Sequence, residues 1–578
     1  MTQQAAQRAR PLVPFAYAAA LVLAALGIYA GQLSGPFIFD DVQSIVDNQT
    51  LRSLDAAFSP PRETSVAGRP LANLSFAIDY ALHGLSPAAF HATNLALHCA
   101  CVLLAFLVLL RLFAAAGLPA WLGEHAHEHA FLAALMFCVH PMVIELVLYT
   151  TQRTETLVAL CYLTAMLLLL AAAVSARRFW LQALSLAWLS VLGVCAKEVF
   201  VTAPFVLLLC DRAFYAGSLR AALQKRWILY LSLCLCLPVA WLLQRSGPRS
   251  DSVHFFSFDY VLTQARIAPE YFAHALLPGV PQLDYGQLWP QSLAEGWPWL
   301  AFSAGAVLVA SIWAWRAPRS GFVWCWTLLI LAPSSSVLSI HTEIGAERRF
   351  YLPLIAVLTC VCVAVSALLE RVLVEQSPQL RRAARRTAFT LALCACGLMA
   401  LHTRSHTDDF RSLRAFWTAA VRARPDNARA HYNLAETLRR EGDVHGAIAS
   451  FRSALQVQEG YAEAHSNLAA LLSATGALNE AFMHAERGVQ LAMDSPIAHY
   501  TLAITCALSG QIERAISELE VTLRLAPDHW DARRNLAKAY LMLGRPRAAR
   551  EHAQKLLAHI PSDALAQKVV EQTGAIAK

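Results

Sequence analysis

The first 403 residues contain a series of long apolar blocks separated by polar connections. A helix needs about 20 mostly apolar residues to cross the hydrocarbon core of a bilayer, and about eleven blocks approach that length. The blocks lie at 11–30, 91–115, 130–149, 156–174, 179–196, 199–214, 227–243, 297–315, 320–340, 351–372 and 387–403. The pattern predicts an all-α, polytopic membrane domain over residues 1–403. The first block is too long for the apolar core of a signal peptide and is interpreted as an anchor.

The composition supports this interpretation. Only 15 % of the residues are charged, whereas soluble domains contain about 25 %, so a purely soluble enzyme is excluded. Of the 14 cysteines, all except Cys506 lie in apolar blocks, where a thiol acts as a small hydrophobic side chain. A secreted disulfide scaffold is therefore excluded as well.

The positive residues of the connections predict the orientation of the domain. If the N-terminus is cytoplasmic, the short inner connections hold most of the Lys and Arg residues, as the positive-inside rule requires. Two long connections, 31–90 and 244–296, then lie outside. Because the number of spans is odd, residues 404–578 also lie outside. This topology fits a bacterial inner membrane with a periplasmic tail, or the endoplasmic reticulum of a eukaryotic cell.

The tail, residues 404–578, repeats with a period of 34. The period is marked by Leu434, Leu468, Leu502 and Leu536, by Gly442, Gly476, Gly510 and Gly544, and by Ala447, Ala481, Ala515 and Ala549. This is the spacing of tetratricopeptide repeats, each built from two antiparallel helices. Four repeats are predicted, at about 428–461, 462–495, 496–529 and 530–563. Such an α-solenoid offers a concave surface to a peptide or protein.

Asp40 and Asp41 are the clearest candidates for chemistry, because they follow the first predicted span on the outer side. A carboxylate beside a membrane is costly unless it has a partner or a function. A carboxylate in this place could act as a general base and remove a proton from an acceptor hydroxyl. Paired acids in a loop more often cap a helix or are solvated, so the residue types alone leave both interpretations open.

Further motifs follow in order along the chain. They are Phe39-Asp40-Asp41-Val42, Arg69-Pro70-Leu71, Asp79-Tyr80-Ala81-Leu82-His83-Gly84, Phe90-His91 with Asn94 and His98, His140-Pro141 with Glu145, Arg153-Thr154-Glu155, Ala196-Lys197-Glu198, Leu283-Asp284-Tyr285 and Glu347-Arg348-Arg349-Phe350. With these motifs and the C-terminal repeats, nearly the whole chain resembles the transmembrane and tetratricopeptide-repeat protein O-mannosyltransferases. That family belongs to the polyprenyl-phosphate-sugar-dependent glycosyltransferases of the multi-spanning C-type (GT-C) fold.

The resemblance implies a donor sugar linked through phosphate to a polyprenol, and an acid of the first outer loop, here Asp40, as the catalytic base of an inverting displacement. The departing lipid phosphate needs cations or backbone donors. Arg348 and Arg349 are the first candidates for this role, followed by Arg153 and Lys197. Asp41 could orient the acceptor or bind a divalent cation, and no other cofactor is predicted.

Four further residues, Glu145, Glu155, Glu198 and His91, are candidates for supporting the donor or acceptor site. Each has an alternative role: the two glutamates at 145 and 155 could form loop hydrogen bonds, Lys197-Glu198 could be a self-neutralising pair, and His91 could be an internal hydrogen-bonding residue. Arg348 and Arg349 could simply flank a span and reach the lipid headgroups.

Three hypotheses of function follow from the sequence. The first is a membrane glycosyltransferase whose repeats present a protein acceptor, with transfer of mannose or a similar sugar to Ser or Thr. The second keeps this fold but transfers the sugar to a lipid or an envelope polysaccharide. The third is a non-catalytic membrane scaffold whose repeats gather other proteins; it predicts that Asp40 is dispensable.

Overall fold

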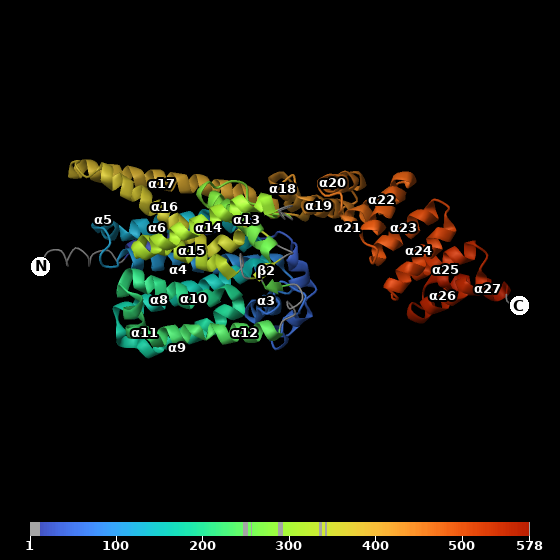
Figure 1. The fold of residues 1–578 in the computed structure, drawn as a ribbon, viewed down its shortest axis with the longest axis horizontal. Coiled ribbons are helices and arrows are strands. Elements are labelled where there is room, and N and C mark those ends of the chain that lie inside the picture. Colours follow the sequence, from blue (N-terminus) through green and yellow to red (C-terminus); the bar gives the residue numbers. More distant parts are fainter. Residues whose placement is uncertain are drawn as a thin grey trace. The chain divides into compact units, whose positions relative to one another are not determined.

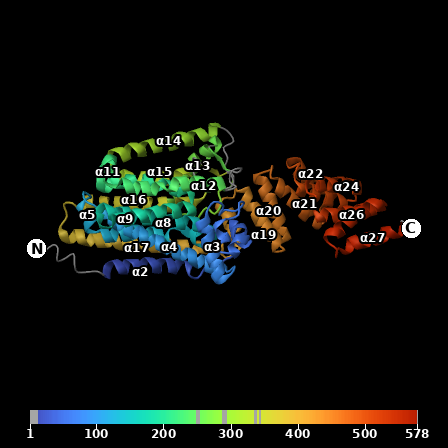
Figure 2. The ribbon, with the colours of Figure 1, turned by 90° about the horizontal axis from the view of Figure 1, so that it is seen from below.

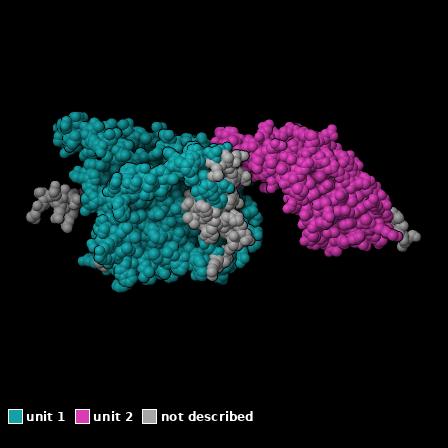
Figure 3. Space-filling model, viewed as in Figure 1, with its two compact units in different colours: residues 1–419 teal, residues 420–578 magenta. Residues whose placement is uncertain are grey.

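The computed structural model describes residues 12–246, 253–255, 257–286, 293–333, 338–340 and 344–576. The chain divides into two compact units, Met1–Ala419 and Ala420–Lys578, which are coloured separately in Figure 3. The regular structure of the described residues is helical except for one antiparallel ribbon, in which β1 (Val253–Phe255) pairs with β2 (Leu338–Ile340). The predicted helical class is confirmed.

In the described part of the first unit, eight helical segments are long and apolar enough to cross a membrane, or nine if one bent pair counts as a span. The first four segments are Pro87–Phe113 (α4), Thr150–Val174, Phe179–Ala196 (α9) and Glu198–Ala216; the second contains α8 (Arg153–Val174) and the fourth contains α10 (Ala203–Asp211). The fifth, Leu219–Gln244, is formed by α11 (Leu219–Cys234) and α12 (Cys236–Ser246). The last three are Ala294–Arg316 in α14 (Leu293–Arg316), Glu347–Val372 with α16 (Tyr351–Val372), and Pro378–Phe410 with α17 (Pro378–Thr407). The bent pair joins α6 (Ala126–Val139) to Pro141–Leu148, which contains α7 (Ile144–Leu148), at 61°. These segments overlap nine of the predicted spans.

The other two predicted spans differ from the structure. The block at 11–30 forms α2 (Leu12–Tyr29), a shorter apolar helix. The block at 320–340 is not one helix: its first part belongs to α15 (Pro318–Ala332), and its last three residues form β2. Pro333 follows α15 directly and has no N–H with which to extend the helical hydrogen bonds.

Helix α4 lies at the centre of the membrane unit (Figure 1), where it packs against α6 and α8. Phe106 of α4, Phe137 of α6 and Tyr162 of α8 are fully buried in this core. The predicted outer loop 31–90 is a compact structure of short helices, η1 (Val42–Val46), η2 (Gln49–Arg52), η3 (Ala56–Phe58) and α3 (Pro70–His83). Their shared apolar core includes Ile45 and Phe76. The second outer loop contains α13 (Phe258–Leu276).

The end of α17 belongs to the membrane unit. The guanidinium of Arg404 donates to the carbonyl oxygens of Gly27 and Ile28 at the end of α2, and Thr403 Oγ1 donates to the carbonyl of Val139 over 2.6 Å. Figure 2 shows α2 and α17 side by side. The predicted domain boundary, between residues 403 and 404, therefore falls inside α17, and the first unit continues to Ala419.

The second unit consists of helix pairs at the predicted period. They are α19 (Ala428–Arg440) with α20 (Val444–Val457), α21 (Ala462–Ala474) with α22 (Leu478–Leu491), α23 (Pro496–Leu508) with α24 (Ile512–Leu525), and α25 (Trp530–Met542) with α26 (Pro546–His559), followed by α27 (Ala564–Ile576) and preceded by α18 (Leu413–Ala423). The four periodic glycines sit in the turn of each pair with φ of 84°, 86°, 79° and 65°, a conformation that favours glycine. The periodic alanines, 447, 481, 515 and 549, are fully buried between the helices.

The repeats share a second periodic feature. Residues 431, 465, 499, 533 and 567 each hydrogen-bond the backbone carbonyl six residues earlier, with His, His, His, Arg and Gln side chains and distances of 2.7–2.9 Å. The first helix of each repeat is thus tied to the end of the preceding repeat. A change of residue type at this register keeps the bond as long as a donor remains.

We expect the repeat unit to lose stability in mild acid, with His465 as a main contributor. His465 Nδ1 lies 2.9 Å from Nδ1 of His484, and burial lowers the pKa of both imidazoles below 6.5. Because the folded state binds fewer protons than the unfolded state, the free energy of unfolding falls as the pH falls below about 6.5. His465→Gln should reduce this dependence, since Gln567 makes the same carbonyl bond without titrating.

The measurement is the calorimetric unfolding temperature of the repeats in the full-length protein between pH 8 and pH 5. His445→Gln is the control, because His445 is exposed. Equal pH slopes for wild type and His465→Gln would contradict the assignment.

Candidate functional site

The two adjacent aspartates of the first outer loop have different surroundings. Asp40 is partly exposed, whereas Asp41 is fully buried. The residue before them, Phe39, has φ of 48° and is the one non-glycine residue with positive φ in the described part of the chain. This conformation is strained for a bulky side chain.

Asp41 anchors the loop through backbone hydrogen bonds. Its Oδ2 accepts from the N–H groups of Ile38 and Thr150, each over 3.2 Å, and its Oδ1 accepts from the N–H of Thr151 over 2.8 Å. Burial raises the pKa of the Asp41 carboxyl to about 7, against the opposing effect of these three donors. The carboxyl therefore holds the loop against η5 (Thr150–Gln152), and most of its acceptor sites are occupied.

Tyr149 connects Asp40 to the cationic residues. Its hydroxyl accepts a hydrogen bond from the backbone N–H of Asp40 over 3.3 Å. The guanidinium carbon of Arg348 lies 5.5 Å from the centre of the same ring. The Phe39 ring contacts Tyr149 on one side and Trp417 on another, with ring centres 6.5 and 5.8 Å apart. The backbone of Asp40 and the buried guanidinium of Arg348 thus both contact Tyr149.

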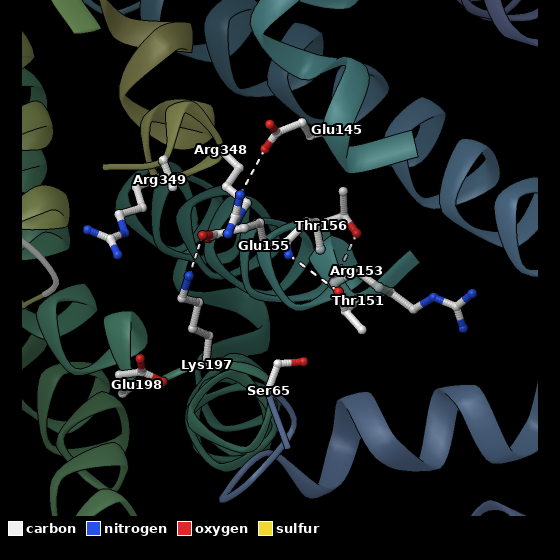
Figure 4. A network of polar contacts seen from close by, with 12 residues as sticks. Ser65, Glu145, Thr151, Arg153, Glu155, Thr156, Lys197, Glu198, Arg348 and Arg349 are labelled. Carbon is white, nitrogen blue, oxygen red and sulfur yellow. Dashed lines mark hydrogen bonds and ion pairs between the residues drawn. The ribbon is translucent and has the colours of Figure 1, made fainter. Parts of the chain in front are cut away.

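The predicted cations Arg348, Arg349 and Lys197 are all buried, and each is held by protein groups. Arg348 forms an ion pair with Glu145 over 3.0 Å, and Lys197 forms an ion pair with Glu155. Arg349 donates to the Tyr260 hydroxyl and to the carbonyl of Ile344, each over 3.2 Å. Figure 4 shows Arg348, Lys197 and Glu155 converging at the middle of this network.

A small cavity lies beside Lys197 and Arg349. It is lined by Glu155, Lys197, Val199, Ile330, Arg349, Tyr351 and Leu352, and its volume of about 10 Å³ is room for one water molecule. Both cations therefore border a polar space that is too small for a phosphate group. A ligand would need to displace these side chains in order to enter.

Arg153 lies elsewhere in the fold. Its guanidinium is completely buried. Nε donates to Asn94, Nη1 to the Ser75 backbone and hydroxyl, and Nη2 to the carbonyl of Phe90. Nη2 also forms a 2.6 Å ion pair with Asp79, so each nitrogen of the guanidinium has a partner within the protein. Figure 4 shows its guanidinium pointing away from Arg348 and Lys197. The structure does not bring this predicted phosphate ligand to the other cations.

Glu198 and His91 also have partners within the protein. Glu198 receives a bidentate ion pair from Arg69, with N–O distances of 2.9–3.2 Å. Nδ1 of His91 hydrogen-bonds the carbonyl of Leu33 over 2.7 Å, which matches its alternative role as an internal hydrogen-bonding residue. In the described residues, no group of three or more His, Cys, Asp or Glu side chains is arranged to hold a metal ion.

Three important residues were not among the predicted site residues. Tyr149 and Tyr260 contact the site through their hydroxyls, and Arg69 neutralises Glu198. Arg69 stands in one of the motifs that carry the family resemblance, which is a usable signal. Nothing in the spacing of the two tyrosines distinguishes them from other aromatic residues of the membrane domain.

We expect Asp41→Asn to destabilise the protein by about 1–3 kcal/mol, because an amide nitrogen would replace an oxygen that accepts a backbone N–H. The measurement is the unfolding free energy in detergent. Asp47→Asn is the control, since Asp47 lies exposed in the same loop. An unchanged unfolding free energy in Asp41→Asn would show that the loop does not depend on this carboxyl.

Comparison with known proteins finds repeats in the C-terminal part of the chain. Family models described as tetratricopeptide repeat match residues 411–462 and 507–572, which confirms the predicted repeats. A solved structure titled as YrrB, a TPR protein with an unusual peptide-binding site, is 21 % identical, covers 27 % of this chain and 81 % of that chain, and has a TM-score of 0.25.

The similar curated proteins are protein O-mannosyl-transferases. The chain is 32 % identical over 167 residues to protein O-mannosyl-transferase Tmtc3 of Drosophila melanogaster, and this match covers 25 % of this chain and 18 % of that protein. The chain is 24 % identical over 504 residues to protein O-mannosyl-transferase TMTC4 of Mus musculus, and this match covers 73 % of this chain and 64 % of that protein. The first relatives are thus matched over about a fifth of their length. The resemblance inferred from the sequence motifs is confirmed.

Proposed function

We propose that this protein is an integral membrane glycosyltransferase that transfers mannose or a similar sugar from a polyprenyl-phosphate donor to a Ser or Thr hydroxyl of a protein. The observation that carries the proposal is the arrangement around Tyr149, whose hydroxyl bonds the Asp40 backbone while Arg348 lies over its ring. Tyr149 thus contacts both the loop that carries the proposed base and the cation proposed for the leaving group. The names of the similar curated proteins support the same reaction class.

In the proposed reaction the acceptor oxygen attacks the anomeric carbon of the donor sugar. The bond from that carbon to the phosphate oxygen breaks, with inversion, and the acceptor proton moves to the Asp40 carboxylate. Polyprenyl phosphate leaves with the bonding electron pair. Only Asp40 of the two aspartates suits the base role, because it is partly exposed while Asp41 is occupied by backbone donors.

Arg348 and Arg349 are proposed to stabilise the departing phosphate, with Lys197 close behind them. Charged donors aimed at a developing anion are effective in a buried site, where water does not screen them. Glu145 and Glu155 hold Arg348 and Lys197 in place until donor phosphate competes for them. The contacts of Asp41 do not support a role in binding a divalent cation, since the Asp41 oxygens already accept hydrogen bonds from three backbone N–H groups.

The repeats are proposed to bind the acceptor protein, because stacked helix pairs offer an extended surface for a polypeptide. In this proposal the membrane is a bacterial inner membrane with periplasmic repeats, or the endoplasmic reticulum, and the site faces away from the cytoplasm. No observation in the structure favours a lipid or polysaccharide acceptor, or a non-catalytic scaffold.

The test is a comparison of glycopeptides and glycolipids from membranes of cells with and without the protein. The proposal expects one set of Ser- or Thr-linked glycopeptides to disappear with the protein, and their mass difference identifies the sugar. Loss of a glycolipid with all glycopeptides retained would move the acceptor to the lipid class. No change in either fraction would overturn the enzyme assignment.

A further inference from the structure

A long apolar groove runs along the membrane unit on a face that the proposed reaction does not use. It lies between α6, α16 and α17, which run alongside one another in Figure 1, and has a volume of about 590 Å³. Its walls include Leu132 and Met136 of α6, Val365 of α16, and Ala392 and Met399 of α17. From Arg385 to His402 the groove follows α17 for about 25 Å, most of the ~30 Å hydrocarbon thickness of a bilayer.

The groove is bridged by protein at the end nearer Asp40. There His402 Nε2 hydrogen-bonds the carbonyl of Gly279 over 3.0 Å, and His140 Nε2 hydrogen-bonds the carbonyl of Ala275 over 3.3 Å. This end lies near the point where Arg404 bonds the end of α2, shortly before the loop that carries Asp40. The opposite end, where α16 turns into α17, is crossed by the ion pair of Arg385 with Glu370, so bridging does not distinguish the two ends. The charge around each end then decides where a headgroup fits.

That opposite end is rich in arginine. Arg371, Arg381, Arg382, Arg385 and Arg386 lie within or beside the α16–α17 turn. Arg385 is paired with Glu370 through two 2.7 Å contacts and also contacts His125, while Nε of Arg381 donates to the carbonyl of Gln376. Arg382 and Arg386 are exposed, and their guanidinium groups make no hydrogen bond or ion pair within the described chain.

Arg382 extends the row of groove residues on α17. Residues 385, 389, 392, 396 and 399 line the groove at helical spacing, and residue 382 is the next position of that row towards the turn. Arg386 lies one turn after Arg382. Two unengaged positive side chains thus stand beside the arginine-rich end of a groove with apolar walls.

We propose that this groove binds one acyl chain of an anionic glycerophospholipid whose phosphate headgroup is held by Arg382 and Arg386. Clusters of Arg beside a membrane helix attract anionic headgroups, each contributing about a fivefold gain in affinity near the surface. The polyprenyl-phosphate donor is a poorer occupant, because its phosphate must reach Arg348, at the end that His402 and Gly279 bridge. Apart from this exclusion of the donor, the inference does not rest on the proposed transfer reaction.

The test is native mass spectrometry of the delipidated full-length protein, titrated separately with dioleoyl phosphatidylglycerol and dioleoyl phosphatidylcholine. We expect wild type to retain phosphatidylglycerol at lower lipid concentrations than phosphatidylcholine. The double variant Arg382→Gln/Arg386→Gln should weaken phosphatidylglycerol binding by about 25-fold, from about fivefold for each arginine, and leave phosphatidylcholine unchanged. Ala392→Phe, which fills the groove, should weaken the binding of both lipids.

The matched control is Arg177→Gln/Arg178→Gln, because these arginines are also exposed beside a membrane helix, but no residue of that helix, α9, lines the groove. It should bind phosphatidylglycerol as wild type does. Equal retention of both lipids by wild type, or equal losses in the two double variants, would overturn the proposal. The proposal would also be overturned if Arg382→Gln/Arg386→Gln weakened the binding of undecaprenyl phosphate as strongly as the binding of phosphatidylglycerol.

Discussion

Asp40→Asn is expected to reduce the rate of sugar transfer by about 10²–10⁴-fold while the protein folds and inserts normally. The amide cannot accept the acceptor proton, but it has nearly the same size as the carboxylate. The contact that positions the loop is kept, because it is the backbone N–H of Asp40, and not its side chain, that bonds Tyr149. The partial exposure of Asp40 makes a large loss of stability unexpected.

The measurement is the initial rate of transfer from a polyprenyl-phosphate sugar to acceptor protein in membranes, together with glycopeptides from the cells. Asp47→Asn serves as the control, because it removes an exposed acid from the same loop and should keep the wild-type rate. If Asp40→Asn keeps that rate as well, the base lies elsewhere. If cells without the protein lose glycopeptides while cells with Asp40→Asn keep them, the scaffold hypothesis gains.

Patterns that are local or periodic predicted the fold well. A run of about 20 apolar residues favours a buried or membrane-spanning helix, because a helix pairs all the backbone polar groups of the segment within itself. A 34-residue period with buried Ala447 and a turn at Gly442 leaves little choice but paired helices. The block at 320–340 failed for a local reason that hydropathy averages out, which is the proline at position 333.

The division of roles at the site could not be predicted in the same way. Asp40 and Asp41 are chemically identical neighbours, and part of their difference arises because Thr150 and Thr151, more than 100 positions later, present backbone N–H groups to Asp41. Arg348 and Glu145 likewise pair across about 200 residues. A linear motif lists charged residues, but the tertiary fold decides which of them are neutralised within the protein and which can face a ligand.

Arg153 shows the consequence, and Arg153→Gln is expected to destabilise the protein by about 3–5 kcal/mol. The change removes the partner of buried Asp79 and breaks hydrogen bonds to Asn94, Ser75 and Phe90. An uncompensated charge would remain in the interior, between the outer-loop helix α3 and the spans α4 and α8. Lysine at position 153 should rescue only part of the loss, because its ammonium has three donors in place of five.

The measurement is the unfolding free energy in detergent, combined with the KM for donor of the fraction that remains folded. Arg52→Gln is the control, since Arg52 is an exposed arginine of the loop 31–90 and lies over the ring of Tyr80. A structural role for Arg153 predicts low stability but an unchanged KM for donor. Wild-type stability with a raised KM would instead return Arg153 to the phosphate site. The same pair of measurements on Arg348→Gln should show both effects, because Arg348 pairs with buried Glu145 and is proposed to contact the leaving group.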